Sequence, residues 1–280
     1  MADGYRILGS IRSNLASISR SFTRSDMAVD VMVPCTEKSM KVLRAVVPSV
    51  RRNLRHRIGE IFIVAPKSES IEAYCAKEGL SYVNEVELMG FSKDMIKHVY
   101  NGEDRSGHMY QQLLKLYSDQ LGKEAHIYIH DSDTLMLRPF RFDSGGKIVL
   151  QYYEHVSQEY LDHFYKLFPG YSNIDVSFIC NQMFLKKSLL REIRSEIEKR
   201  HQGKPWWRTL VDLMDLSQQS GFSEYETIGQ YIVHTRNPEY SKELEHYLNR
   251  GLTLGNWEKR PYKWVLFPMK YKTLSFHSYQ

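Results

Sequence analysis

Short apolar runs alternate with amphipathic stretches through the first half of the chain. The apolar runs at 28–33, 61–65 and 80–83 predict buried strands. Between them, apolar residues recur at helical spacing, which predicts one helix from near Glu37 and another over 69–78. Strands and helices that alternate in this way indicate a mostly parallel sheet with helices on its faces.

The second half of the chain continues this pattern with less regular spacing. A helix is expected from Gly107 to Gly122, followed by a strand at 126–130. Further strands are predicted at 147–152 and 177–184, and a long amphipathic helix at 187–200. No internal repeat or low-complexity tract divides the chain. We therefore expect an α/β fold in a single compound domain.

Composition places the chain among ordinary globular proteins. The 280 residues are 42% hydrophobic and 25% charged, which excludes a disordered or collagen-like chain. No apolar stretch approaches the roughly 18 residues of a membrane span, and the N-terminus lacks the pattern of a signal peptide. Three scattered cysteines without a CxxC motif indicate a reducing, cytoplasmic compartment.

The net charge of +5 is too small to indicate a nucleic-acid partner, but it is unevenly distributed. Residues 1–26 hold four arginines against two aspartates, and residues 251–280 hold five basic residues against one glutamate. Basic and aromatic residues interleave near the C-terminus, which suits an anionic membrane interface. A water-exposed surface with aromatic core anchors is the alternative. The basic residues concerned are Arg6, Arg12, Arg20, Arg24, Lys259, Arg260, Lys263, Lys270 and Lys272.

Two acidic residues close one of the predicted strands. Asp131-Ser132-Asp133 follows the apolar strand at 126–130, and ligands of open α/β sheets bind at this carboxyl edge. Two carboxylates two residues apart can share Mg²⁺ or Mn²⁺, which would neutralise a diphosphate. A solvated turn is the alternative, although the preceding buried strand favours metal. A haloacid-dehalogenase-type phosphatase is disfavoured, because its motif needs Thr or Val where Leu135 stands.

A second pair of acidic residues opens a predicted helix. Ser223 and Glu226 have the spacing of a capping box, which gives Glu226 a structural role. Glu224 lies in the first helical turn without that role. It either stabilises the helix dipole or faces a cleft as a general base, and spacing alone leaves both open.

Six segments, taken in their order along the chain, resemble those of GT-A-type glycosyltransferases. The resemblance is closest to a little-characterised bacterial group of glycosyltransferase-like proteins. Each segment is modest alone, but the ordered set is fairly specific. The chain departs from that group at His108, where a tryptophan is expected. The segments are Val33–Thr36, Ile61–Pro66, Gly107–Lys115, the DxD motif Asp131–Asp133, Ser223–Glu226 and Leu274–Ser278.

This resemblance implies a GT-A-like, Rossmann-related fold and a hexosyltransferase-like activity. A sugar would pass from a UDP-linked nucleotide-sugar donor to a bacterial surface polysaccharide or lipid-linked acceptor, such as a lipopolysaccharide precursor. The enzyme would be cytoplasmic, in peripheral contact with the inner face of the cell membrane. Residues 1–26 would form a basic arm, 27–137 a nucleotide-sugar-binding half, and 138–280 an acceptor-binding half with the C-terminal tail.

The resemblance also assigns roles to individual residues. Asp133 and Glu224 would be catalytic, with Glu224 as the base of an inverting enzyme or a sugar ligand of a retaining one. Mn²⁺ or Mg²⁺ would be held by Asp131, Asp133 and His277. The donor-binding residues would be Pro34, Cys35, Thr36, Gln111, Lys115, Asp131, Ser132, Asn181 and Gln182.

Several of these assignments have simpler alternatives. His277 could lie on an exposed tail, and Lys115, which could reach a phosphate, could lie on a solvated helix face. Asn181 and Gln182 interrupt an apolar strand, where buried amides need hydrogen-bond partners. Either a sugar hydroxyl or the backbone could supply those partners.

Two other functions fit the predicted fold. A nucleotidyltransferase should carry a glycine-rich loop after its first strand, and residues 34–38 contain no glycine. A non-catalytic sugar- or nucleotide-binding protein would bind the donor without turning it over. Turnover of a nucleotide sugar is therefore the property that separates these hypotheses.

Overall fold

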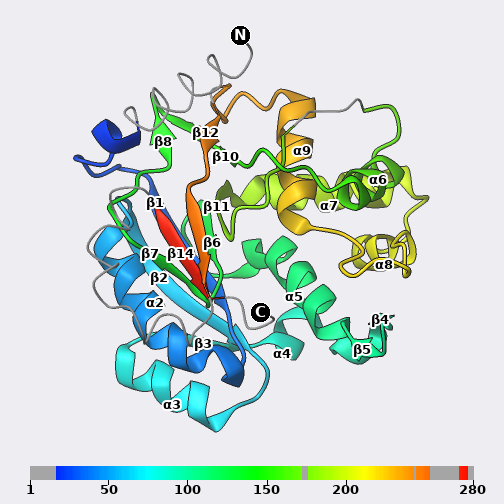
Figure 1. The fold of residues 1–280 in the computed structure, drawn as a ribbon, viewed down its shortest axis with the longest axis horizontal. Coiled ribbons are helices and arrows are strands. Elements are labelled where there is room, and N and C mark those ends of the chain that lie inside the picture. Colours follow the sequence, from blue (N-terminus) through cyan, green and yellow to red (C-terminus); the bar gives the residue numbers. More distant parts are fainter. Residues whose placement is uncertain (1–16, 172–175, 243, 253–270, 277–280) are drawn as a thin grey trace.

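The computed structural model describes residues 17–171, 176–242, 244–252 and 271–276 (Figure 1). Its centre is a five-stranded sheet whose strands, in spatial order, are β11 (Gln182–Lys186), β6 (His126–His130), β1 (Ala28–Pro34), β2 (Arg57–Ala65) and β3 (Ser81–Asn84). Four of these strands run parallel, and only β11 pairs with its neighbour in the antiparallel direction. The predicted α/β fold with a mostly parallel sheet is confirmed.

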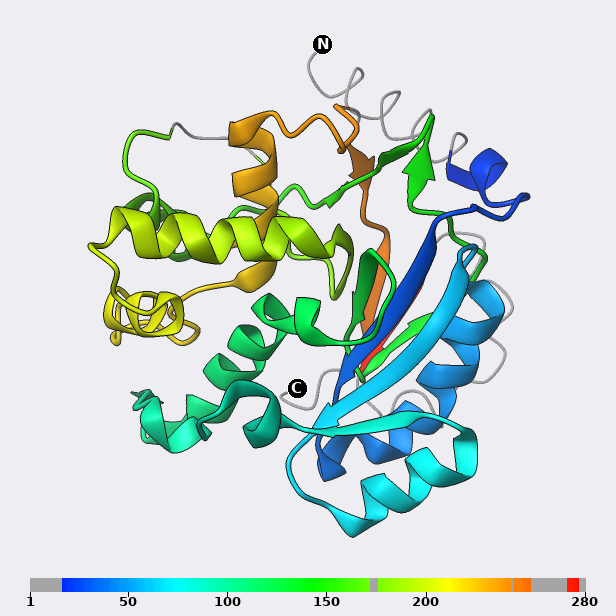
Figure 2. The same ribbon diagram turned by 180° about the vertical axis from the view of Figure 1, so that it is seen from behind.

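Helices cover both faces of this sheet, as Figure 1 and Figure 2 show from opposite sides. On one side lie α2 (Met40–Asn53) and α3 (Glu69–Glu78). On the other side lie α5 (Ser106–Leu116), α7 (Lys187–Arg200) and α9 (Glu224–Thr235). Val31, Ile63 and Ile129 in the central strands have 0% exposure, so the sheet forms the core between the two helical layers.

Further helices and strands complete the described chain. None of the described helices is long and apolar enough to cross a bilayer. The helical ones are η1 (Glu37–Ser39), α4 (Glu85–Met89), η2 (Lys93–Met95), η3 (Ser118–Gln120), α6 (Gln158–Leu167) and α8 (Trp206–Asp212). The strands are β4 (Val99–Tyr100), β5 (Glu103–Asp104), β8 (Asp143–Ser144), β9 (Lys147–Ile148), β10 (Gln151–Tyr152) and β12 (Glu245–His246).

A second, three-stranded sheet brings the C-terminal part of the chain to the end of β6. Its strands, in order, are β13 (Asn249–Leu252), β14 (Thr273–Phe276) and β7 (Thr134–Met136). Ser275 pairs with Thr134, and the amide of Phe276 donates a hydrogen bond to the carbonyl of Asp133 over 2.9 Å. The C-terminal segment therefore reaches the acidic strand end, although nothing in the local pattern predicted this pairing.

Some observed elements differ from the predicted ones. The strand predicted at 61–65 begins four residues earlier, as β2, and the strand predicted at 147–152 is divided into β9 and β10. The strand predicted at 177–184 begins only at β11, because Asn181 adopts the left-handed conformation with a φ of 49°. The helix predicted to end at Gly122 ends earlier, and η3 follows it. None of these differences changes the order of the elements.

The described part of the N-terminal arm packs on the domain. Arg20 forms an ion pair with Glu245, which also pairs with Lys272. Lys272 is 2% exposed, and its ammonium lies 5.1 Å from the ring centroid of Phe140. The prediction that Lys272 belongs to a membrane-facing surface is therefore wrong. Except for Arg24, the other basic residues predicted to face the membrane lie outside the described residues.

Candidate active site

A buried lysine joins two carboxylates at the carboxyl edge of the sheet. The Nζ atom of Lys115 lies 2.6 Å from Oδ1 of Asp131 and 2.6 Å from Oε1 of Glu224. The hydroxyl of Tyr225 donates to Oδ1 of Asp131 over 3.2 Å, and the ammonium lies 4.3 Å from the centroid of the tyrosine ring. We call these four residues the Lys115 cluster. It unites α5, the end of β6 and the start of α9.

The sequence around the cluster explains how α5 and α9 meet. Gln112 precedes Lys115 by one helical turn, and its Oε1 accepts a hydrogen bond from the backbone amide of Glu224 over 3.2 Å. Ser223 caps α9, because its hydroxyl accepts from the amide of Glu226 over 3.3 Å. The first turn of α9, with Glu224 in it, is thereby fixed against α5.

Burial and charge act on Lys115 in opposite directions. Burial lowers the pKa of its ammonium, but the Asp131 and Glu224 carboxylates raise it by more, so the pKa lies above its ordinary value of 10.5. Lys115 is therefore charged at neutral pH. Two carboxylates around one ammonium leave the cluster with an excess of negative charge.

The DxD segment forms a tight turn after β6. The amide of Asp131 donates to the carbonyl of Asn181 over 3.0 Å, and the Thr134 hydroxyl donates to Oδ1 of Asp133 over 3.1 Å. The Ser132 hydroxyl donates to Oγ of Ser39 over 3.0 Å. Ser39 is the last residue of η1, so this contact joins the acidic turn to the segment that follows the predicted donor-binding residues at 34–36.

The three predicted donor-binding residues after β1 differ in accessibility. Pro34 and Cys35 are buried, whereas Thr36 is exposed. Burial raises the pKa of the Cys35 thiol to about 11, so the thiol is protonated at neutral pH. The amide of Thr36 donates to Oγ of Ser39 over 3.2 Å. Thr36 is thus the side chain of this loop that a ligand can reach directly.

The polar residues predicted on β11 and α5 are placed differently from one another. Gln182 is 1% exposed, and its amide bonds to Tyr128 over 2.6 Å and to Gln151 over 2.8 Å, so it is used inside the protein. Asn181 contributes its carbonyl to the DxD turn. Gln111 is half-buried on α5. Of these residues, Gln182 has both ends of its amide occupied by protein partners.

His108, where the chain departs from the resembling group, lies within electrostatic range of the cluster. Burial is the main cause that lowers the pKa of His108 to about 4; the charges of Arg105 and Lys115 act in the same direction, and that of Asp131 in the opposite one. The imidazole is therefore neutral at pH 7. It has one donor and one acceptor nitrogen, whereas the expected indole has a donor only.

Glu226 has the structural role that its spacing predicted, with different partners from those of a capping box. Its carboxylate accepts hydrogen bonds from the Ser177 hydroxyl over 2.7 Å, the Phe178 amide over 3.0 Å and the Gln230 amide over 2.7 Å. Burial raises the pKa of this carboxyl above its ordinary value, although all three hydrogen bonds lower it. Glu226 therefore holds the segment before β11 against α9.

Carboxylate oxygens are ligands that a hard divalent cation accepts, and Mg²⁺ is commonly bound by one or two of them together with substrate phosphates. Asp131 and Asp133 are the predicted carboxylates, and Oδ1 of Asp131 also contacts Lys115 and Tyr225. Within the described ranges, no three His, Cys, Asp or Glu side chains are grouped to hold a metal. The third predicted ligand, His277, lies outside these ranges.

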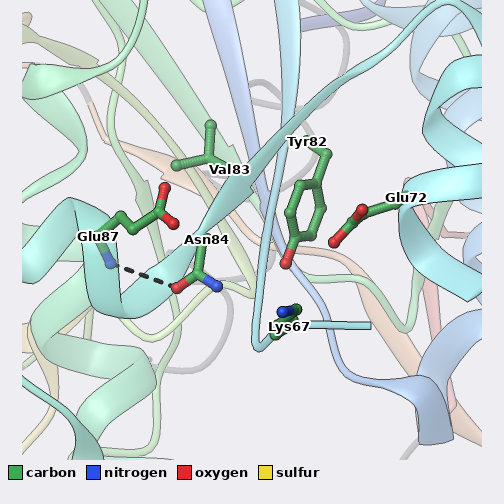
Figure 3. A pocket seen from close by; sticks show the side chains of 6 residues that line it. All are labelled: Lys67, Glu72, Tyr82, Val83, Asn84 and Glu87. Atoms are coloured by element: carbon green, nitrogen blue, oxygen red, sulfur yellow. Dashed lines mark hydrogen bonds between the residues drawn. The ribbon is translucent and has the colours of Figure 1, made fainter. Parts of the chain in front are cut away.

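A cavity of about 350 Å³ lies at the same carboxyl edge, beyond the end of β3 (Figure 3). Tyr82 and Asn84 reach it from β3, and Lys67 from the loop after β2. The amide of Glu87 donates to Oδ1 of Asn84 over 3.3 Å. Sequence reasoning missed this hollow. The only local signal was a strand that ends in a helix-capping asparagine.

Comparisons with solved structures identify the fold. The structure of the galactosyltransferase LgtC with donor and acceptor sugar analogues matches at a TM-score of 0.50 and 10% identity, over 90% of this chain and 88% of LgtC. The chain therefore has a GT-A glycosyltransferase-like fold. Mouse xyloside xylosyltransferase 1 is also similar, at a TM-score of 0.48 and 13% identity, over 90% and 98% of the two chains.

A family match covers most of the chain. Residues 35–254 match the family of unknown function DUF6492, and the chain belongs to this family. No curated protein sequence matches this chain. The glycosyltransferase resemblance predicted from the motifs is confirmed at the level of the fold. The bacterial group within that resemblance stays a prediction.

Proposed function

We propose that this protein is a glycosyltransferase that moves a sugar from a nucleotide-sugar donor to a glycan or lipid-linked acceptor. The observation that carries the proposal is the Lys115 cluster, which holds Asp131 and Glu224 together at the carboxyl edge of a GT-A sheet. Ligands of open α/β sheets bind at this edge. Asp133 lies two residues from Asp131, where a metal-diphosphate would sit.

Each side chain has a distinct part in the proposed donor site. Asp131 and Asp133, with His277 as the proposed third ligand, would hold Mn²⁺ or Mg²⁺. When bound, such a cation stabilises the negative charge that develops on a leaving nucleoside diphosphate. Ser132 and Thr36 are linked by hydrogen bonds through Ser39. This link between the DxD turn and the loop after β1 supports contact with the base and ribose of a UDP-linked donor.

Glu224 is the proposed residue for the transferred sugar or the acceptor. Lys115 pairs with its carboxylate, and Gln112 accepts a hydrogen bond from its backbone amide. In an inverting reaction it accepts the proton of the acceptor hydroxyl as the new glycosidic bond forms. In a retaining reaction it holds a hydroxyl of the donor sugar.

Lys115 is proposed as a positioning residue. Its ammonium lies between the two carboxylates and is 6% exposed, so it prevents them from repelling each other in a buried site. Asp131 is the more accessible partner, with 19% of its side chain exposed against 4% for Glu224. This arrangement leaves Asp131 able to face a ligand while it remains paired.

The proposed surroundings are the cytoplasm and the inner face of a bacterial membrane, where a surface-polysaccharide or lipopolysaccharide precursor would be the acceptor. Cys35, Cys75 and Cys180 are all buried and unbridged, which supports a reducing compartment. With Lys272 buried, the proposed membrane contact rests on the other basic residues of the predicted set, which are Arg6, Arg12, Arg24 and those at 259–270.

The direct test is a thermal-shift screen with nucleoside diphosphates and nucleotide sugars, with and without Mn²⁺. We expect one nucleotide family to raise the melting temperature by about 5 °C at saturating concentration, and only when metal is present. Stabilising nucleotide sugars are then incubated with the protein and assayed for released nucleoside diphosphate. Stabilisation without release would indicate a binding protein, and no stabilisation by any nucleotide would contradict the proposal.

Glu224→Gln should lower donor turnover by about 100-fold while leaving the melting temperature close to that of the wild type. The fold should survive because Asp131 still pairs with Lys115. A base role predicts a fall in kcat at constant donor KM, whereas a sugar-binding role predicts that KM also rises.

Glu226→Gln is the matched control, two residues along the same helix. It replaces an acceptor of three hydrogen bonds by an amide, so we expect the unfolding free energy to fall by about 2 kcal/mol with little change in kcat. Loss of turnover in Glu226→Gln at an unchanged melting temperature would show that the catalytic carboxylate had been assigned to the wrong residue.

A further inference from the structure

A second and larger cavity lies in the half of the molecule that holds α6 and α8. Its volume is about 840 Å³, and it is bounded by α6 and the loop that follows α8. Three carboxylates line it, from Glu159, Asp162 and Asp215, with Lys166 as the one lysine or arginine in the lining. The proposed donor site uses none of these residues.

The cavity adjoins the Lys115 cluster through the segment that leads into α9. Gly221 lines the cavity and precedes Glu224 by three residues. Burial raises the pKa of the Tyr160 hydroxyl on α6 to about 12, a hydrogen bond to Ser220 lowers it, and the charges of Glu159 and Glu224 add to the rise. This part of α6 therefore lies within electrostatic range of Glu224.

The lining is rich in hydrogen-bond acceptors and negative charge. Burial lowers the pKa of His163 to about 4, so its imidazole adds no positive charge at pH 7. Three carboxylates against one ammonium leave an excess of negative charge on the cavity wall. The Gln158 amide already donates to Oδ1 of Asp162 over 2.7 Å, which fixes the direction of that carboxylate.

His163 supplies an independent sign that the cavity takes a ligand. The residue is 2% exposed, and its Nε2 lies 2.9 Å from the carbonyl of Leu210. A carbonyl only accepts, so Nε2 carries the proton and Nδ1 is left as an acceptor. Within the described chain, this buried Nδ1 has no hydrogen-bond partner. A buried acceptor without a donor costs about 1–3 kcal/mol, which a hydroxyl or amine of a ligand would remove.

We propose that this cavity is a subsite for an aminated sugar of the acceptor, whose ammonium pairs with Asp162 and Asp215 and whose hydroxyl or amine donates to His163. The identification of this sugar as an acceptor rests on the proposed glycosyltransferase function. The binding itself does not, because it can be measured without a donor. The ammonium and hydroxyl groups of such a sugar are donors that the carboxylates of the wall and Nδ1 of His163 can accept from.

The test is titration calorimetry with two oligosaccharides of the same backbone. Chitosan tetraose carries four amines, and chitin tetraose carries the same sugars with neutral acetamides. We expect the wild type to bind the aminated tetraose at least about tenfold more tightly, with weaker binding at high salt. Asp162→Asn/Asp215→Asn should weaken binding of the aminated tetraose by about fivefold without affecting the neutral one. Glu69→Gln, which removes an exposed carboxylate on α3, is the control and should bind like the wild type.

His163→Phe tests the second contact. Phenylalanine keeps a ring at this position but has no hydrogen-bond acceptor, so the affinity for both tetraoses should fall. Equal affinity of the wild type for the two tetraoses, or full affinity in the double variant, would overturn the proposal. So would the absence of binding at millimolar tetraose. A normal thermal shift with nucleotides in the same preparation would show that the donor site had not failed with it.

Discussion

Asp133→Asn should lower metal-dependent donor hydrolysis and sugar transfer by about 10³-fold or more. A divalent cation contributes several kcal/mol to stabilising charge on a leaving diphosphate, and the variant removes one of the two carboxylates proposed to hold it. The fold should remain intact, because the Thr134 hydroxyl can still donate to the retained amide oxygen and the Asp133 carbonyl still accepts from Phe276. Initial rates of nucleotide release over a range of Mn²⁺ concentrations measure the effect.

The control for this experiment is Asp94→Asn, which changes an exposed aspartate in η2 in the same way and should keep full activity. A second readout is the Mn²⁺-dependent part of the thermal shift with nucleotide, which Asp133→Asn should abolish. Full activity in Asp133→Asn would exclude the metal role of this residue. Lost activity with an unchanged Mn²⁺-dependent thermal shift would indicate that Asp133 binds the sugar instead of the metal.

The sequence predicted best those features that depend on neighbouring residues. The boundaries of α3 and α7 coincide with their predicted ranges, since apolar spacing along a helix is a local property. The pairing of β14 with β7 could not be found this way, because it joins residues about 140 positions apart in the chain. Its strands are also only three and four residues long, too short for a clear alternating pattern.

The site followed the same division between local and long-range information. The position of Asp131 and Asp133 at a strand end was predictable, because the preceding apolar strand marks it. The pairing of Lys115 with Asp131 and Glu224 was not, because three elements must first pack together. Gln182 shows the reverse case: its polar side chain suggested a ligand contact, but Tyr128 and Gln151 satisfy it inside the protein.

Lys115→Met should be the most destabilising change at the site, lowering the unfolding free energy by about 3–5 kcal/mol. Removing one partner of a buried ion pair leaves an uncompensated charge, and here two carboxylates would face each other without the ammonium. For a chain of this size, the expected fall in melting temperature is about 10 °C. Turnover should fall as well, since Asp131 and Glu224 would lose their common anchor.

The pKa of Lys115 determines the pH range over which the wild type and Lys115→Met should differ in unfolding free energy. The pKa is raised in the folded state, so the stabilisation is complete below the ordinary value of 10.5 and is lost only as the pH rises through the folded value. The difference between wild type and Lys115→Met should therefore be constant from about pH 7 to about pH 9. Denaturant unfolding at several pH values in this range measures it.

Two further variants separate charge from packing. Lys77→Met removes an exposed lysine from α3 and should leave stability nearly unchanged. Lys115→Met/Glu224→Gln should recover at least half of the lost stability, because Glu224 is the more deeply buried carboxylate and Asp131 can turn toward water. If the double variant were no more stable than Lys115→Met, the loss would come from packing around the lysine stem. The ion pairs would then not be what holds α5, β6 and α9 together.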